Sequence, residues 1–256
     1  MKFLKKDRLT VNIYESRDVM GKAAAKDIKA RILSLLKEKE SIRMIFAAAP
    51  SQNEVLASLA CDKEIPWERV HAFHMDEYIG LSADAPQGFG NFLRAHIFGI
   101  APFASVNYID ISATDAEAEC ARYASLLSQA PIDIVVMGIG ENGHIAFNDP
   151  PVADFEDEKL VKPVALDEVC RQQQVNDGCF ASLADVPKTA ITLTVPALFA
   201  GGALFCVVPA RTKACAVKST LSGEIGEWCP ATVLRRHPNA VLYLDKDSGA
   251  LLEEIG

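Results

Sequence analysis

The sequence lacks several features that would place it in other classes of protein. Its seven cysteines include no Cys-x-x-Cys pair and are odd in number, so neither a zinc site nor a disulfide framework is expected. No apolar run approaches the roughly 20 residues that cross a bilayer, and residues 1–7 lack the apolar core of a signal peptide. The net charge of −8 disfavours nucleic acid or a membrane surface as the main partner. We therefore expect a reduced, cytoplasmic protein whose partner is a small molecule.

Internal repeats, low-complexity tracts and Gly/Ser-rich linkers are also missing from the 256 residues. Half of the residues are apolar, which is enough for a chain of this length to bury a substantial core. We therefore expect a single domain over residues 1–256.

The sequence that is present alternates apolar, β-branched runs with segments of helical periodicity. Expected strands cover 9–14, 43–49, 70–75, 132 to the glycine at 138, 190–195, 203–208 and 240–243. Expected helices follow Ser16 and Asn53 and cover 90–98, 116–127 and 212–221. This alternation predicts an α/β fold with one open, mostly parallel sheet and helices on both faces, Rossmann-like and doubly wound. The polar, less regular segment 150–186 is a candidate active-site flap.

The most informative stretch is an apolar strand that ends in a glycine-rich turn. Gly138 and Gly140 allow the backbone to approach a ligand closely. His144 follows, with Asn142 and Asp149 near it in the sequence. Ligands of open α/β sheets bind beyond the carboxyl ends of the strands, and a histidine beside a carboxylate transfers protons near neutral pH. The turn therefore predicts an enzyme.

Another predicted strand runs directly into two carboxyl groups. Asp76 and Glu77 follow the apolar residues 70–75 and precede a tyrosine. The pair is either part of a catalytic site or an ordinary solvated loop.

Two further strand ends could hold an anion. Ser51, Gln52 and Asn53 precede a predicted helix, where free backbone N–H groups bind phosphate, although the same residues also form ordinary helix caps. Lys213 lies in the first turn of another predicted helix, where the helix dipole disfavours a cation unless an anion is bound. A solvated surface lysine is the alternative.

Three of these motifs together resemble glucosamine-6-phosphate deaminase. They are His-Met-Asp-Glu-Tyr at 74–78, Gly-Ile-Gly-Glu-Asn-Gly-His-Ile-Ala-Phe-Asn-Asp-Pro at 138–150, and Thr-Lys at 212–213. Their order and separations are those of the family, and the similarity extends from the first helix to Asp245. The related 6-phosphogluconolactonases share the fold and a Gly-His turn, but usually lack the Phe-Asn-acid-Pro continuation.

The resemblance implies conversion of glucosamine 6-phosphate, or a close analogue, into fructose 6-phosphate and ammonia. It assigns Asp76 as the base that removes the C2 proton and His144 as the group that opens the sugar ring. Asn142 and Asp149 would orient the imidazole. The implied substrate contacts are Ser51, Gln52, Asn53, Glu77, Gly138, Gly140, Arg171 and Lys213. No metal or organic cofactor is implied, and a homo-oligomer is compatible with the sequence.

The sequence departs from the family beside the histidine. Many relatives carry Asp and Glu where this chain has Asn142 and Asp149. Asn142 keeps the hydrogen bond and loses the charge. Asp149 is one methylene shorter, so we expect the pocket to move inward or to recruit a water in order to reach His144.

The phosphate side departs further. Gly178 replaces an arginine that binds phosphate in well-known members of the family. Lys213, with Arg171 or Arg211, would then hold the anion. Loss of one bidentate arginine should weaken phosphate binding.

Two other functions compete with the deaminase. A sugar-lactone hydrolase would use His144 to activate water and would leave Asp76 without a carbon-bound proton to remove. A non-catalytic sugar-phosphate sensor would need neither residue. Because both residues are present, we rank the sensor last.

Overall fold

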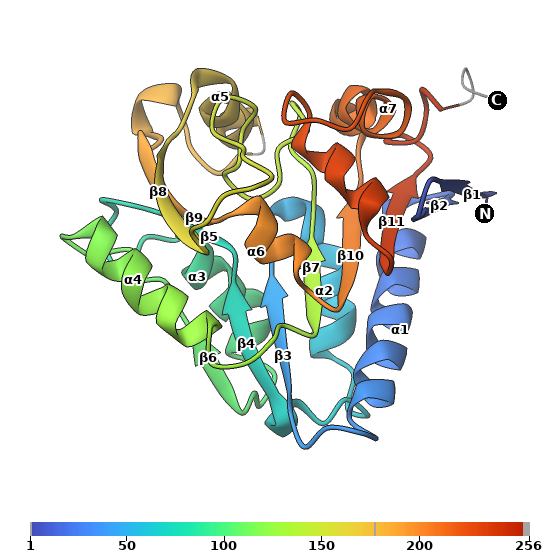
Figure 1. Cartoon of the computed structure of the whole chain (residues 1–256), viewed down its shortest axis with the longest axis horizontal. Helices are drawn as coiled ribbons and strands as arrows, with labels where there is room; N and C mark the ends of the chain where they lie inside the picture. The colour runs from blue at the N-terminus through green and yellow to red at the C-terminus, as the bar shows by residue number, and fades with distance from the viewer. Residues whose placement is uncertain (1, 177, 253–256) are drawn as a thin grey trace.

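The computed structural model describes residues 2–176 and 178–252, and eight of its strands form one large sheet (Figure 1). Their order is β1-β2-β11-β10-β7-β3-β4-β6, with β1 antiparallel to β2 and every other neighbouring pair parallel. The strands are β1 (Lys2–Lys6), β2 (Leu9–Tyr14), β3 (Ile42–Phe46), β4 (Val70–His74), β6 (Ser105–Asn107), β7 (Ile134–Met137), β10 (Ala203–Val208) and β11 (Ala240–Asp245). The predicted α/β class with a mostly parallel sheet is confirmed; β1 and β6 were not expected.

Helices cover both faces of this sheet, as predicted. Along β3, Phe46 packs into one buried cluster and its neighbour Ile45 into another, because successive side chains of a strand point to opposite faces. In Figure 1, α6 lies in front of the sheet and α2 behind it. The first cluster includes α1 (Arg17–Leu35), α2 (Asn53–Ala60) and α3 (Phe89–Leu93); the second includes α4 (Ala116–Leu127), α6 (Val195–Phe199) and α7 (Ala214–Ser222).

Two of the expected helices are less regular than their sequence pattern suggested. The predicted helix 90–98 is α3 followed by a π-helical turn at Arg94–Phe98, and the predicted helix 212–221 begins with a 3₁₀ turn at Arg211–Lys213. Within the described residues, none of the helices combines the length and apolar character needed to span a bilayer.

A second, smaller sheet was not predicted. It has the order β5-β9-β8 and is antiparallel, built from β5 (Asp76–Tyr78), β9 (Thr189–Leu193) and β8 (Val161–Ala165). The expected strand at 190–195 therefore belongs to this sheet and not to the parallel one. The reason is non-local pairing: Asp76 lies opposite Thr192, a partner that the apolar pattern of either strand does not reveal.

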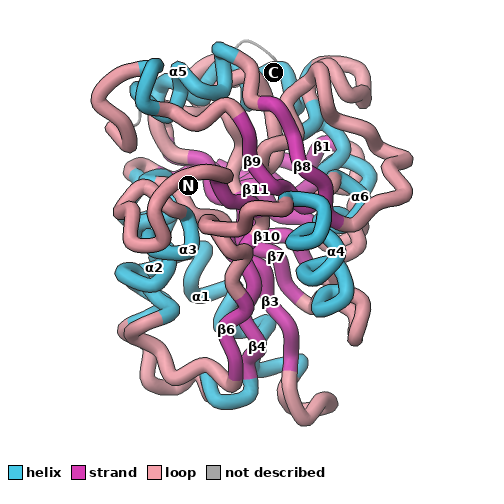
Figure 2. Tube along the Cα trace, turned by 90° about the vertical axis from the view of Figure 1, so that its left-hand side faces the viewer, coloured by secondary structure: helices cyan, strands magenta, loops and turns pink. Residues whose placement is uncertain are grey.

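The segment 150–186, expected to be irregular, contains β8 and the helix α5 (Glu168–Asn176). Figures 1 and 2 show α5 at the top of the molecule, above the carboxyl ends of the parallel strands. A segment that the sequence suggested as a flap is thus ordered and lies over the region where ligands of such sheets bind.

The chain reverses its direction of travel through the sheet between β3 and β7. From β3 it continues to β4 and β6 on one side, and from β7 it continues to β10 and β11 on the other. The loops after β3 and β7 therefore diverge and leave a crevice between them, which is the usual ligand site of an open α/β sheet.

Candidate active site

A cavity lies at this switch point, beyond the carboxyl ends of β3, β4, β7 and β10 and against α5. Seven of the residues predicted from the sequence line it: Ser51, Gln52, Asp76, Gly138, Gly140, His144 and Lys213. Four separate stretches of sequence therefore contribute to one site. Asp76 and His144, the two residues to which the resemblance assigns proton transfer, are both among them.

The imidazole of His144 is held from behind by two residues of its own loop. Its Nδ1 lies 2.9 Å from Oδ1 of Asp149, and the same oxygen accepts a 2.8 Å hydrogen bond from the Asn142 side-chain amide. Oδ1 of Asn142 accepts a 3.0 Å hydrogen bond from the His144 backbone N–H. Asp149 thus reaches His144 directly, without the bridging water considered as one outcome of its shorter side chain.

The surroundings of Asp149 favour its ionised form. Burial by itself raises the pKa of this carboxyl group. The hydrogen bond and charge of His144, with the Asn142 amide and the Cys170 thiol, outweigh burial and lower the pKa below its ordinary value. A carboxylate that stays charged beside the imidazole can stabilise the imidazolium formed during proton transfer.

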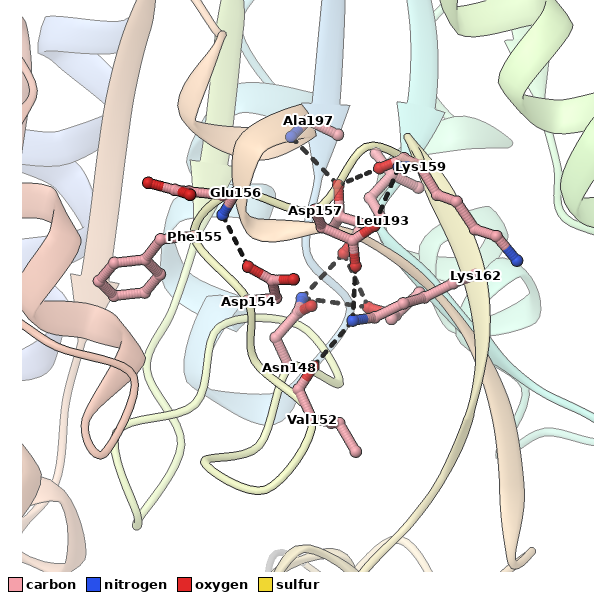
Figure 3. Close-up of polar contacts among 12 residues, drawn as sticks. Asn148, Val152, Asp154, Phe155, Glu156, Asp157, Lys159, Lys162, Leu193 and Ala197 are labelled. Atoms are coloured by element: carbon pink, nitrogen blue, oxygen red, sulfur yellow. Dashed lines mark hydrogen bonds and ion pairs between the residues drawn. The ribbon is translucent and has the colours of Figure 1, made fainter.

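The loop around Asp149 is tied to the small sheet (Figure 3). The buried side chain of Asn148 donates a 2.8 Å hydrogen bond to the carbonyl of Leu193. Lys162 on β8 donates to the carbonyl of Val152 and to Asp157, each at 2.8 Å. These contacts fix the backbone on both sides of Asp149, and so fix the carboxylate behind His144.

Gly140 is required by the position of the His144 ring. A Cβ atom at Gly140 would lie 2.1–2.3 Å from three atoms of the imidazole, far inside van der Waals contact. The Gly140 backbone N–H donates a 2.9 Å hydrogen bond to the His144 carbonyl, which closes the turn. The glycine-rich sequence therefore has a local cause: the ring packs directly on bare backbone.

Asp76 enters the cavity from the first residue of β5. Its side chain is buried, and its pKa is raised well above the ordinary value, first by burial and second by the neighbouring charge of Glu77. A carboxyl group with a raised pKa is a stronger base once it has lost its proton.

Glu77, expected to contact substrate, lies outside the cavity lining. Its carboxylate accepts backbone hydrogen bonds from Phe89 at 2.9 Å and Gly90 at 2.8 Å, at the start of α3. Burial raises the pKa of Glu77 to about 7, even though these N–H groups favour its ionised form. Strand alternation explains the difference, because consecutive residues of β5 point to opposite faces. Glu77 anchors α3 and acts on Asp76 through its charge.

The side of the cavity near Lys213 combines one cation with uncharged groups. Lys213 is almost fully buried there. Gln52 is fully buried and donates hydrogen bonds to the Val207 carbonyl at 3.1 Å and to Ser51 Oγ at 3.0 Å. Asn53 begins α2 and is not among the lining residues.

Helix α5 contributes two side chains that the sequence analysis missed. Gln173 and Gln174 line the cavity, and Oε1 of Gln173 accepts a 2.8 Å hydrogen bond from the backbone of Glu141, in the glycine-rich turn. The run of three glutamines was the available signal. Without a clear apolar period in this segment, the run does not show which glutamines face the cavity.

The arginine expected to help bind phosphate points elsewhere. Arg171 donates from its guanidinium to the carbonyls of Leu183 at 2.5 Å and Val186 at 3.0 Å, and so braces the chain after α5. Arg211 is exposed, and neither arginine lines the cavity. Gly178 has φ of +76° and open space where a side chain would begin. Among the described lining residues Lys213 is therefore the cation that faces the cavity, while the expected phosphate contact of Arg171 stays a prediction that this orientation does not support.

Comparison with known proteins points in the same direction as this geometry. Residues 15–243 match the family of glucosamine-6-phosphate isomerases/6-phosphogluconolactonase. A glucosamine-6-phosphate deaminase from Listeria innocua is 34% identical over 211 residues, which cover 82% of this chain and 88% of the relative.

Two solved structures share the fold. A monomeric glucosamine-6-phosphate deaminase superposes with a TM-score of 0.85 at 27% identity, covering 94% of this chain and 99% of that one. The 6-phosphogluconolactonase of Thermotoga maritima gives a TM-score of 0.75 at 22% identity, covering 93% and 100% of the two chains. The second likeness concerns the fold alone.

Replacing Gly140 by alanine should displace the His144 ring, because the new methyl group would occupy the position of the imidazole. We expect a changed ring environment in the NMR spectrum of protein labelled at histidine, with the circular dichroism spectrum preserved. Gly138→Ala is the matched control, since its Cβ would come only to 3.1 Å from the Gln52 amide. An unchanged His144 signal in Gly140→Ala would show that the packing is not restrictive.

Proposed function

The chain belongs to the glucosamine-6-phosphate isomerase/6-phosphogluconolactonase family, and we propose that it converts glucosamine 6-phosphate, or a close analogue, into fructose 6-phosphate and ammonia. The observation that carries this proposal is the presence of Asp76 and His144 in the lining of one cavity. The deaminase needs both a base for a carbon-bound proton and a group that opens the ring. A lactone hydrolase needs only a group that activates water, and a sensor needs none of these groups.

His144 is the proposed group for ring opening. With Nδ1 directed to Asp149, the other ring nitrogen, Nε2, is the one that can exchange a proton with the sugar. It takes the proton of the anomeric hydroxyl and returns a proton to the ring oxygen, which gives the open-chain aldehyde. Asp149 stabilises the imidazolium between the two transfers.

Asp76 is the proposed base for the isomerisation. It removes the proton from C2 of the open-chain sugar while the protonated amino group gives one of its protons to the C1 oxygen. Asp76 then returns its proton to C1, and water replaces nitrogen at C2 to release ammonia as the ammonium ion. The amino group of the substrate, when protonated, favours the ionised form of Asp76, which burial and Glu77 otherwise disfavour. Substrate binding can thus generate the base that it needs.

The phosphate group would be bound by Lys213 together with hydrogen-bond donors from Ser51 and the glutamines of α5. Charged and neutral donors combine readily on one phosphate. We also propose a cytoplasmic location, since all seven cysteines are free thiols. Assembly into a homo-oligomer stays a prediction.

Asp76→Asn should lower turnover by at least about 10²-fold, because the amide cannot remove the C2 proton. The assay is ammonia release from glucosamine 6-phosphate, with 6-phosphogluconolactone hydrolysis measured in parallel. Asp84→Asn, in an exposed loop, is the control and should keep full activity. Near-normal ammonia release from the Asp76 variant would rule out its role, and lactone hydrolysis without ammonia release by the unaltered protein would favour the hydrolase.

Lys213→Ala should mainly raise KM, because a buried cation on the anion side of the cavity is lost while the proton-transfer groups stay in place. Arg211→Ala, two residues away and exposed, should leave KM within about twofold. Steady-state kinetics on both variants separates the contributions. Equal KM values for the two variants would argue against a phosphate contact at Lys213.

The acid limb of kcat/KM should lie above the ordinary aspartate range of about 4, because Asp76 works when ionised and its pKa is raised. Glu77→Gln removes a neighbouring negative charge, so the pKa of Asp76 should fall and the limb should move to lower pH. Thermal melting checks that α3 stays in place in this variant. An acid limb at the same pH in the unaltered protein and in folded Glu77→Gln would contradict the assignment of Asp76 as the base.

A further inference from the structure

A third side chain, which is not among those that line the cavity, lies close to the His144–Asp149 pair. The thiol of Cys170, on α5, offers a ligand atom that lies within 4.8 Å of those of His144 and Asp149. All three side chains are buried, with exposed fractions of 8% for His144, 2% for Asp149 and 1% for Cys170. The cluster joins the loop that holds His144 and Asp149 to a cysteine on α5. The spacing of the cysteines in the sequence does not indicate this cluster.

The two carboxylate oxygens of Asp149 differ in their hydrogen bonds. Oδ1 of Asp149 is engaged by Asn142 and faces His144. Oδ2 is buried and, among the described residues, accepts no hydrogen bond of normal geometry. A buried carboxylate oxygen without a partner is costly. A cation bound to this oxygen and to the Cys170 sulfur would compensate it in place of the thiol proton.

An imidazole nitrogen, a carboxylate oxygen and a thiolate sulfur form a ligand set that suits Zn²⁺. We propose that His144, Asp149 and Cys170 form an inhibitory zinc site, which switches off the deaminase activity proposed above. Tetrahedral bonds of about 2.0–2.3 Å place the ligand atoms about 3.5 Å apart, so modest side-chain rotation closes the site. Water fills the fourth position.

Zinc at this position blocks the proposed ring opening for a specific chemical reason. The metal binds the lone pair of His144 Nδ1 and displaces the thiol proton of Cys170 to solvent. The neutral imidazole then carries its own proton on Nε2. It has no nitrogen left to accept the proton of the anomeric hydroxyl, so the sugar ring stays closed.

The ligand set also defines which ions should act. Mg²⁺ and Ca²⁺ prefer oxygen ligands and should not compete for a site with one sulfur and one nitrogen. The metal can enter from the cavity, because His144 forms part of its lining. The site is thus selective for borderline-soft ions and reachable without unfolding.

Metal binding is tested first without an activity assay. Zn²⁺ is titrated against a chromophoric chelator, and Co²⁺ is used as a spectroscopic probe, with the full chain and with a Cys61→Ser/Cys215→Ser variant that lacks the two exposed thiols. We expect one tightly bound Zn²⁺ in the variant and a near-ultraviolet sulfur-to-cobalt charge-transfer band. Adding Cys170→Ser should remove the band and weaken Zn²⁺ binding at least about tenfold.

Cys179→Ser is the matched control, since this half-buried cysteine follows the same helix and lies outside the cluster. It should keep both the band and the affinity. If Cys170→Ser melts at a much lower temperature, Cys170→Ala serves in its place. Unchanged Zn²⁺ affinity without the Cys170 thiol, or loss of the cobalt band in the Cys179 variant, would overturn the proposal.

Inhibition is tested second. Zn²⁺ should stop ammonia release, a chelator should restore it, and equal Mg²⁺ should have no effect. The Cys170 variant should need at least about tenfold more Zn²⁺ for the same inhibition. Because the cobalt band is read without substrate, a protein that binds metal but releases no ammonia would contradict the proposed reaction alone. Full activity with Zn²⁺ bound would contradict the inhibitory role.

Discussion

The contact between the His144 imidazole and the Asp149 carboxylate is the interaction around which the candidate site is arranged. It is buried, and much of the surrounding structure serves to hold it. Gly140 gives the ring a flat surface of backbone, Asn142 bridges the two residues, and Asn148 ties the loop to the small sheet. A histidine positioned by packing and hydrogen bonds in this way loses little entropy when substrate binds.

The adjacent carboxyl groups of Asp76 and Glu77 also depend on burial and on a close neighbour. In the role proposed for Asp76, a base for a carbon-bound proton must be strong, and burial beside another acid raises the pKa of this carboxyl group. Glu77 can stay in this costly place because backbone N–H groups of α3 compensate its charge. The hydrogen bonds that anchor α3 are thereby linked, through the charge of Glu77, to the pKa of Asp76 on the opposite face of β5.

The sequence was sufficient for features that depend on local pattern and on strand ends. Continuous apolar runs in β3 and β7 and the glycines after β7 predicted where these strands end, and parallel topology then brought Asp76, His144 and Lys213 together. The sequence was not sufficient where distant segments pair or where the orientation of a side chain decides its contacts. The sheet of β5, β8 and β9 depends on such pairing.

Side-chain direction explains the remaining differences. Arg171 and Gln174 lie on one helix less than a turn apart, and yet the first braces the chain after the helix while the second lines the cavity. Without a clear apolar face on α5, the sequence could not orient that helix about its axis. For the same reason the sequence did not place Cys170 beside Asp149 and His144, which lie 21 and 26 positions earlier in the chain.

The orientation of Arg171 has a consequence for how the proposed substrate would be recognised. With Lys213 as the one cation among the described lining residues, a doubly charged phosphate would be held largely by neutral amides and a hydroxyl. Such groups act over short range and only in the correct direction, and dissolved ions screen them little compared with distant charges. Selectivity would then come from molecular shape rather than from net charge, and it would persist across a wide range of ionic strength.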